Sequence, residues 1–166
     1  DRIHLCRLVD GSQDVKGIAI PLDPTVKLEL DKKILSVDVK SKRVFSDNSM
    51  FGYDKLIIAT GSIPIALFNV DHVSNATVFR NADDSEKIKN GVTNREVVIV
   101  GSGPIALELL ETLNQTPDAK HITLLVRGKH LYSKDLSMDS IKTIEESYVK
   151  SGKVAISYED EILDKE

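Results

Sequence analysis

Residues 97–110 hold the side chains and glycines best suited to chemistry. Gly101 and Gly103 stand one residue apart after a β-branched run, and Ala106 takes the place of a third small residue before an apolar helical pattern. This order suits a pyrophosphate, because Gly101 permits a tight turn, Gly103 lets the backbone approach the phosphates and Ala106 allows helix and strand to pack closely. The alternative is a structural glycine turn in an ordinary βα unit. The favoured interpretation predicts a dinucleotide site at Gly101, Ser102, Gly103, Pro104, Ile105 and Ala106.

A basic position follows the next apolar run, residues 122–126. In dinucleotide folds the residue here faces the adenosine ribose: an acid hydrogen-bonds the 2′-hydroxyl of NAD, and an arginine accommodates the 2′-phosphate of NADP. The residue is Arg127, whose guanidinium fork suits bidentate phosphate binding, and Lys129, His130 and Lys134 add positive charge nearby. The sequence therefore favours NADPH over NADH, with a solvated loop of basic residues as the alternative.

The elements that must position these residues alternate between strand and helix. Ile105, Leu109 and Leu113 recur at helical spacing and are expected to share one buried face. Gly152 is a stop signal for a helix expected at residues 138–151. The expected order of strand, helix, strand, helix and strand is typical of one mononucleotide-binding half of a doubly wound α/β fold. The expected elements are a strand at 97–100, a helix at 104–115, a strand at 122–126, a helix at 138–151 and a strand at 153–158.

The earlier part of the chain predicts a different arrangement. Turn residues between short apolar runs favour a small antiparallel meander over residues 34–45. Residues 56–59 are apolar throughout, as in a strand buried on both faces of a parallel sheet. A boundary is expected at residues 91–94, which would divide residues 1–91 from a nucleotide-binding module at 92–166. Further predictions are a short helix using Leu5, Leu8 and Val9, strands at 17–20, 26–30 and 77–79, and a helix at 81–89 that begins at Asn81.

Composition excludes several classes of protein. The formal net charge of −4 and the pI near 5.6 give no reason to expect nucleic acid or a membrane surface as a partner. No apolar run reaches the ~18 residues needed to cross a bilayer, so a cytoplasmic protein is expected. Cys6 is the single cysteine, and the four histidines lack ligand spacing, so neither an intrachain disulfide nor a metal site is expected.

Three stretches together resemble one family, the FAD-dependent pyridine nucleotide–disulfide oxidoreductases. Residues 53–64 are similar to the family's second FAD motif, residues 78–84 to the segment leading into its NAD(P)H domain, and residues 98–108 to its NAD(P)H motif. The similarity covers about residues 26–160 and lies nearest the branch of coenzyme A disulfide reductases, NADH oxidases and nitrite reductase flavin subunits.

The resemblance implies cofactors and roles that the residues alone do not establish. Ala59, Thr60 and Gly61 would line the flavin side, and Glu108 would lie near the nicotinamide carboxamide. Glu108 also fits an exposed glutamate that the helix dipole favours in the first turn. The enzyme would pass hydride from NAD(P)H to FAD and on to a disulfide, oxygen or protein acceptor, and the complete protein would be a homodimer. The family's first glycine motif has no counterpart before Gly61, so an interior segment of a longer flavoenzyme is expected.

Two alternatives remain open. Members with one redox cysteine place it near Cys6, opposite the flavin, whereas other subgroups have a serine there and Cys6 would be an ordinary small side chain. A protein of another class, a stand-alone nucleotide-binding or regulatory module without flavin or redox activity, is also compatible with the glycine motif.

Overall fold

The computed structural model describes residues 2–66, 70, 73–131, 136–160 and 162. The chain divides into two compact units: Asp1–Ile20 with Pro64–Glu166, here the parallel-sheet unit, and Pro21–Ile63, here the meander unit. The helices are η1 (Arg2–His4), α1 (Cys6–Val9), α2 (Val15–Ile18), α3 (Ala82–Val92), α4 (Pro104–Gln115) and α5 (Met138–Val149). The strands are β1 (Ile34–Asp38), β2 (Arg43–Ser46), β3 (Met50–Gly52), β4 (Glu96–Val100), β5 (His121–Val126) and β6 (Val154–Tyr158).

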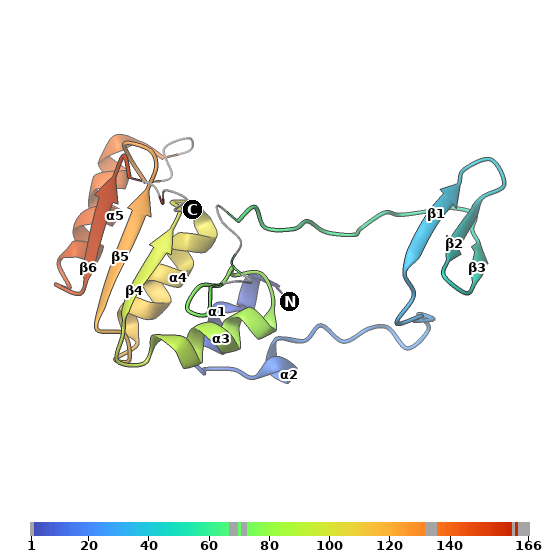
Figure 1. The fold of residues 1–166 in the computed structure, drawn as a ribbon, viewed down its shortest axis with the longest axis horizontal. Coiled ribbons are helices and arrows are strands. Elements are labelled where there is room, and N and C mark those ends of the chain that lie inside the picture. The colour runs from blue at the N-terminus through green and yellow to red at the C-terminus, as the bar shows by residue number, and fades with distance from the viewer. Residues whose placement is uncertain (1, 67–69, 71–72, 132–135, 161, 163–166) are drawn as a thin grey trace. The chain divides into compact units, whose positions relative to one another are not determined.

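The parallel-sheet unit contains the predicted βαβαβ unit. Strands β4, β5 and β6 pair in parallel in that order, with Val97 opposite Ile122 and Leu124 opposite Ile156. Helix α4 connects β4 to β5 and α5 connects β5 to β6, and both lie behind the strands in Figure 1. The prediction of an α/β fold with this element order is confirmed, and the carboxyl ends of all three strands share one edge of the sheet.

The core of this unit lies between the sheet and its helices. Ile122, Leu124 and Val126 of β5 are fully buried and alternate with half-buried residues, so one face of the strand is covered more completely than the other. From α4, the buried side chains are Leu109, Leu110 and Leu113. The expectation that Ile105 shares their buried face was wrong. Its side chain is 51% exposed, because it lies in the first turn of the helix, beyond the end of β4.

Local capping signals located the next helix well. Asn81 caps α3 by accepting from the Asp84 N–H at 2.9 Å, and the Asp84 carboxylate accepts from the Asn81 N–H at 3.0 Å. This reciprocal pair is a capping box, and the predicted start at Asn81 is confirmed. The helix runs on to Val92, beyond the predicted end. The short predicted helix at the start of the chain is also present as α1, which packs against α3 and α4.

Three of the predicted short strands do not form. Residues 17–20 include the end of α2, because the Asp14 side chain caps that helix by accepting from the Gly17 N–H at 2.8 Å. Residues 26–30 and 77–79 have no strand pairing. In the last of these segments, Phe79 packs against two apolar clusters, so its side chain serves the core rather than a β-ladder.

The predicted meander is confirmed in the other unit. Strands β1, β2 and β3 pair antiparallel in that order, and the Asp38 carboxylate accepts from the Lys40 and Ser41 N–H groups in the turn between β1 and β2. The prediction of a buried strand at residues 56–59 was wrong: the segment is extended without pairing, and Ile57 is 87% exposed. A strand needs a neighbour to accept and donate its backbone hydrogen bonds, and none of the described strands pairs with this segment.

Candidate functional site

The turn after β4 explains two of the three small residues. Gly101 has φ +123°, a backbone conformation that L side chains rarely adopt, and its N–H donates to the Leu125 carbonyl at 2.9 Å. A Cβ on Gly101 would meet only the Ala106 Cβ, at 3.9 Å, so conformation rather than space requires glycine here. Gly103 differs, because its φ of −81° suits any residue and a Cβ there would meet nothing within 4 Å. Glycine at 103 therefore leaves open space beside the backbone.

Helix α4 begins without a side-chain cap. Gly103 is its N-cap, Pro104 occupies the first turn and no acidic residue lies there. By contrast, the side chains of Asn81 and Ser137 cap α3 and α5. Among the described residues, no side chain caps the first turn of α4, whose N–H groups lie beside the open space at Gly103. Partial positive charge, free donors and space are what a pyrophosphate requires, so these residues fit a dinucleotide.

The other residues predicted for this site differ in how far they are buried. Ala106 is half-buried and packs against the core, which agrees with close packing of α4 on the sheet. Ser102 is half-buried, whereas Pro104, Ile105 and Glu108 are exposed. The Glu108 carboxylate interacts with Cys6 of α1.

Arg127 lies at the same edge of the sheet as the glycine turn. The Gly101 N–H bonds to Leu125, two residues before Arg127, so the two parts of the predicted site come from adjoining strand ends. Arg127 is exposed directly after β5, as are Lys129 and Gly128. His130 is half-buried, and Lys134 lies outside the described residues. The structure therefore brings together the glycine turn and the basic residue that sequence spacing linked to it.

Two acidic residues at this edge were not predicted. Glu159 and Asp160 follow β6 directly, and both are exposed. The Glu159 N–H donates to the Gly128 carbonyl and the Asp160 N–H to the Val126 carbonyl, each at 3.2 Å. The signal for them was present in the sequence, since polar residues after a parallel strand share the ligand-binding edge with those after its neighbours.

Cys6 lies within the parallel-sheet unit but in a protected position. Its side chain is 6% exposed, in α1, and faces Thr112 and Glu108 of α4. Burial, together with the negative charges of Glu108 and Asp10, raises the pKa of Cys6 to about 11, although a hydrogen bond with Thr112 acts the other way. At neutral pH this environment favours the thiol over the reactive thiolate.

The residues predicted to line a flavin lie in the other unit. Ala59, Thr60 and Gly61 are exposed, without strand pairing, in the meander unit, and Gly61 has φ +74°. Within the described residues they have no covering side chains that would form a flavin cradle. On their own, these exposed residues do not enclose the isoalloxazine ring or the pyrophosphate of FAD.

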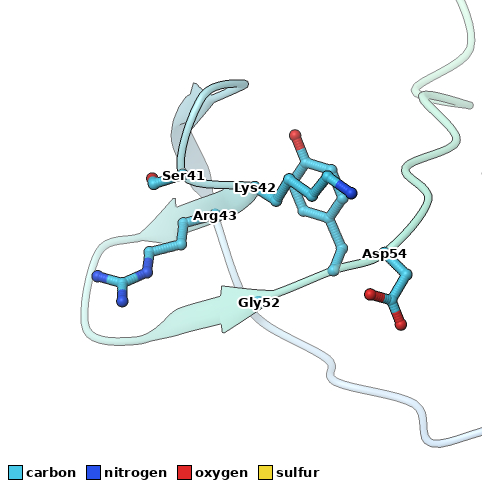
Figure 2. A pocket seen from close by; sticks show the side chains of 6 residues that line it. Ser41, Lys42, Arg43, Gly52 and Asp54 are labelled. Atoms are coloured by element: carbon cyan, nitrogen blue, oxygen red, sulfur yellow. The ribbon is translucent and has the colours of Figure 1, made fainter.

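A hollow of about 400 Å³ in the meander unit was also unforeseen. It is lined by Ser41, Lys42, Arg43, Gly52, Tyr53 and Asp54. Figure 2 shows Lys42 and Asp54 on one side of the hairpin and Arg43 extending to the other side. Because its charged groups do not converge on one point, the hollow does not have the arrangement of a binding site.

Metal-binding clusters and membrane spans are both missing from the described part of the chain. No group of three or more His, Cys, Asp or Glu side chains there is placed to hold a metal ion. None of the described helices has the length and apolar character needed to span a membrane.

The chain belongs to the pyridine nucleotide-disulphide oxidoreductase family, which matches residues 7–163. Terpredoxin reductase from Pseudomonas sp. is 31% identical over 114 residues, which are 68% of this chain and 27% of that protein. Apoptosis-inducing factor 3 from Homo sapiens is 29% identical in an alignment 134 residues long that covers 69% of this chain and 22% of that protein. The family resemblance found in the sequence is confirmed, and the chain spans about a quarter of the length of these relatives.

Solved structures of the same fold are close to this one. The water-forming NADH oxidase from Lactobacillus brevis bound to NADH matches 96% of this chain and 38% of its own, with a TM-score of 0.79 and 20% identity. The covalent putidaredoxin reductase–putidaredoxin complex matches 98% of this chain and 41% of its own, with a TM-score of 0.76 and 21% identity. These likenesses establish the fold.

Proposed function

We propose that this chain is the NAD(P)H-binding part, with an adjoining portion of the FAD-binding domain, of a flavoprotein oxidoreductase. The observation that carries this proposal is the uncapped N-terminus of α4 beside the open backbone at Gly103, directly after a parallel strand. Family membership supports the reaction class, because relatives across the comparisons are named as reductases and NADH oxidases.

In this proposal the pyrophosphate lies across residues 101–106. First-turn N–H groups of α4 donate to its oxygens, Gly103 admits it and Gly101 holds the turn. Glu108, one turn further on, orients the nicotinamide carboxamide. The nucleotide supplies a hydride when bound, and this chain's residues contribute binding and orientation.

The proposed division by cofactor, residues 1–91 for FAD and 92–166 for NAD(P)H, differs from the division by packing. Helix α1 packs on α3 and α4, so the first twenty residues share a unit with the nucleotide site. FAD is proposed for the complete protein, with Ala59, Thr60 and Gly61 on its flavin side, because the described residues alone do not enclose it. Cys6 is proposed as a packing residue on account of its burial and raised pKa.

We propose NADPH rather than NADH as the donor. Arg127 offers an exposed guanidinium at the strand end where a 2′-phosphate would lie. Structural neighbours include both an NADH oxidase bound to NADH and its engineered NADPH-bound form, whose five substitutions introduce two arginines and remove an aspartate. The added arginines of that change have the chemistry that Arg127 provides here.

The electron acceptor, oligomeric state and location are proposals for the whole protein. Terpredoxin reductase and rubredoxin-NAD(+) reductase are named after protein acceptors, which supports a small redox protein as one acceptor class beside small molecules. We propose a cytoplasmic homodimer without nucleic-acid or membrane partners, in keeping with the net charge of −4.

Nucleotide titration tests this proposal. The dissociation constants of NADPH and NADH are measured for the wild type, Arg127→Ala and the control Arg95→Ala. Arg95 is also exposed, but it precedes β4 at the opposite edge of the sheet. We expect Arg127→Ala to weaken NADPH binding about tenfold or more, through loss of charge-assisted hydrogen bonds, while NADH binding and the control stay near wild type. A wild-type protein that binds neither nucleotide would refute the proposed function.

A further inference from the structure

The loop after β6 is bonded to the backbone on both sides of Arg127. The Val126 and Gly128 carbonyls accept hydrogen bonds of 3.2 Å from the N–H groups of Asp160 and Glu159. The two bonds cross, because the later residue, Asp160, bonds the earlier carbonyl, so they lie outside the parallel β5–β6 ladder, whose last pair is Val126 and Tyr158. Arg127 is therefore flanked along the sheet edge by an acidic dipeptide that its own neighbours hold in place.

Glu159 adopts a conformation unusual for its residue type. Its φ of +55° lies in the left-handed region that favours glycine or asparagine. Residues held in that region are enriched at functional sites, where the surrounding bonds maintain the strain. Here the hydrogen bond to Gly128 is one such restraint, and it fixes the backbone that carries the carboxylate at the ribose end of the site.

Charge at this edge is divided between the two loops. The Lys129 Nζ lies 4.0 Å from Glu159 Oε1, so part of the positive charge after β5 is offset by the acid after β6. The Ser157 hydroxyl donates to Asp160 Oδ2 at 2.9 Å and orients the second carboxylate. A 2′-phosphate bound at Arg127 would thus meet two negative charges from the neighbouring strand, whereas an uncharged 2′-hydroxyl would not.

We infer that Glu159, assisted by Asp160, is a specificity-determining residue that limits the preference for NADPH over NADH created by Arg127. The inference rests on the proposed function. Because the Lys129–Glu159 pair is exposed, its removal alters protein stability little, and its effect is expected in ligand affinity.

The test compares nucleotides with and without the 2′-phosphate. Affinities of NADPH, NADH, 2′,5′-ADP and ADP are measured by calorimetry for the wild type and Glu159→Gln. Glu159→Asn is a second variant, because asparagine tolerates the left-handed backbone if glutamine impairs folding. Glu146→Gln is the matched control: it breaks the Lys142–Glu146 pair on α5, which has a 3.9 Å separation and similar exposure.

We expect both Glu159 variants to tighten NADPH and 2′,5′-ADP binding about three- to tenfold, with NADH and ADP changed less than about twofold. The gain should shrink at high salt, as for any exposed charge interaction. The Glu146 control should leave all four affinities unchanged. If Arg127→Ala weakens NADPH binding but both Glu159 variants keep the wild-type ratio of NADPH to NADH affinity, the inference is overturned while the proposed function stands.

Discussion

Alanine substitutions at the two glycines of the β4–α4 turn should have different effects, one on stability and the other on nucleotide binding. Replacement of Gly101 by alanine forces an L residue to φ +123°, at an expected cost of about 1–3 kcal/mol in the free energy of unfolding. Steric clash adds little, since the new Cβ would lie 3.9 Å from the Ala106 Cβ, an ordinary contact distance. Gly101→Ala is therefore expected to destabilise the protein through its backbone alone.

Replacement of Gly103 by alanine should instead weaken NADPH binding and leave stability nearly unchanged. Its φ of −81° and ψ of 175° suit alanine, and the added Cβ meets no atom within 4 Å. The free energy of unfolding should change by no more than about 0.5 kcal/mol, because reduced freedom of the unfolded chain opposes the weaker capping of alanine. The same methyl group would stand where the pyrophosphate approaches, so NADPH affinity should fall about tenfold or more.

Urea unfolding followed by circular dichroism, together with fluorescence titration of NADPH, measures both effects. Gly91→Ala is the control, because Gly91 lies in α3, away from the turn, and a Cβ there would also meet no atom within 4 Å. It should stabilise the helix by up to about 1 kcal/mol and leave NADPH binding unchanged. Equal destabilisation at Gly101 and Gly103, or wild-type NADPH binding by Gly103→Ala, would refute this account of the turn.

Three further outcomes are expected. Lys153 Nζ donates to backbone carbonyls at the C-terminal end of α4, one of them at 2.7 Å. Lys153→Met should therefore lower the free energy of unfolding, measured in urea, by about 1–2 kcal/mol. No change would show that water replaces the ammonium group. Burial and the hydrogen bond to Glu145 raise the pKa of Tyr158 in the folded protein. Tyr158 therefore contributes its full stabilisation below the pKa of the unfolded chain, about 10, and this stabilisation is lost as the pH rises from there toward the pKa of the folded state. Tyr158→Phe should flatten the alkaline decline in stability, and an unaltered slope would contradict the assignment. Cys6, with its pKa near 11, should react with a disulfide reagent at about pH 8 far more slowly in the native than in the denatured protein, and a fast native reaction would show an accessible thiolate.

Local signals in the sequence were sufficient where an element's stabilising contacts are near in the chain. Asn81 and Asp84 form a capping box within one turn, so the start of α3 was predictable to the residue. The strand–turn–helix order around Gly101 was predictable for the same reason, because β-branched residues, glycine positions and helical periodicity all agree. Arg127 was predicted from the rule that, in dinucleotide folds, the residue after the second strand faces the adenosine ribose.

Strands that depend on distant partners could not be predicted in this way. Residues 56–59 are as apolar as β5, yet they pair with no described strand, whereas β5 lies between β4 and β6. Strand propensity measures fit to a sheet surface, which a short sequence window does not contain. Phe79 shows the same limit, since its segment has strand-forming residues but packs into two apolar clusters. The position of Glu159 and Asp160 after β6 is visible in the sequence, but their hydrogen bonds to the Gly128 and Val126 carbonyls are not, because these join segments about 30 residues apart.

The packing of α1 against α3 and α4 also bears on the order of folding. The contacts of β4, β5 and β6 with α4 and α5 join neighbours in sequence, so they close short loops, whereas α1 must find partners far along the chain. Closing long loops slows a folding step, so α1 should dock last and detach first. Its amide hydrogens should then exchange through local opening while those of β5 exchange only on global unfolding, and each opening would briefly expose the Cys6 thiol to solvent.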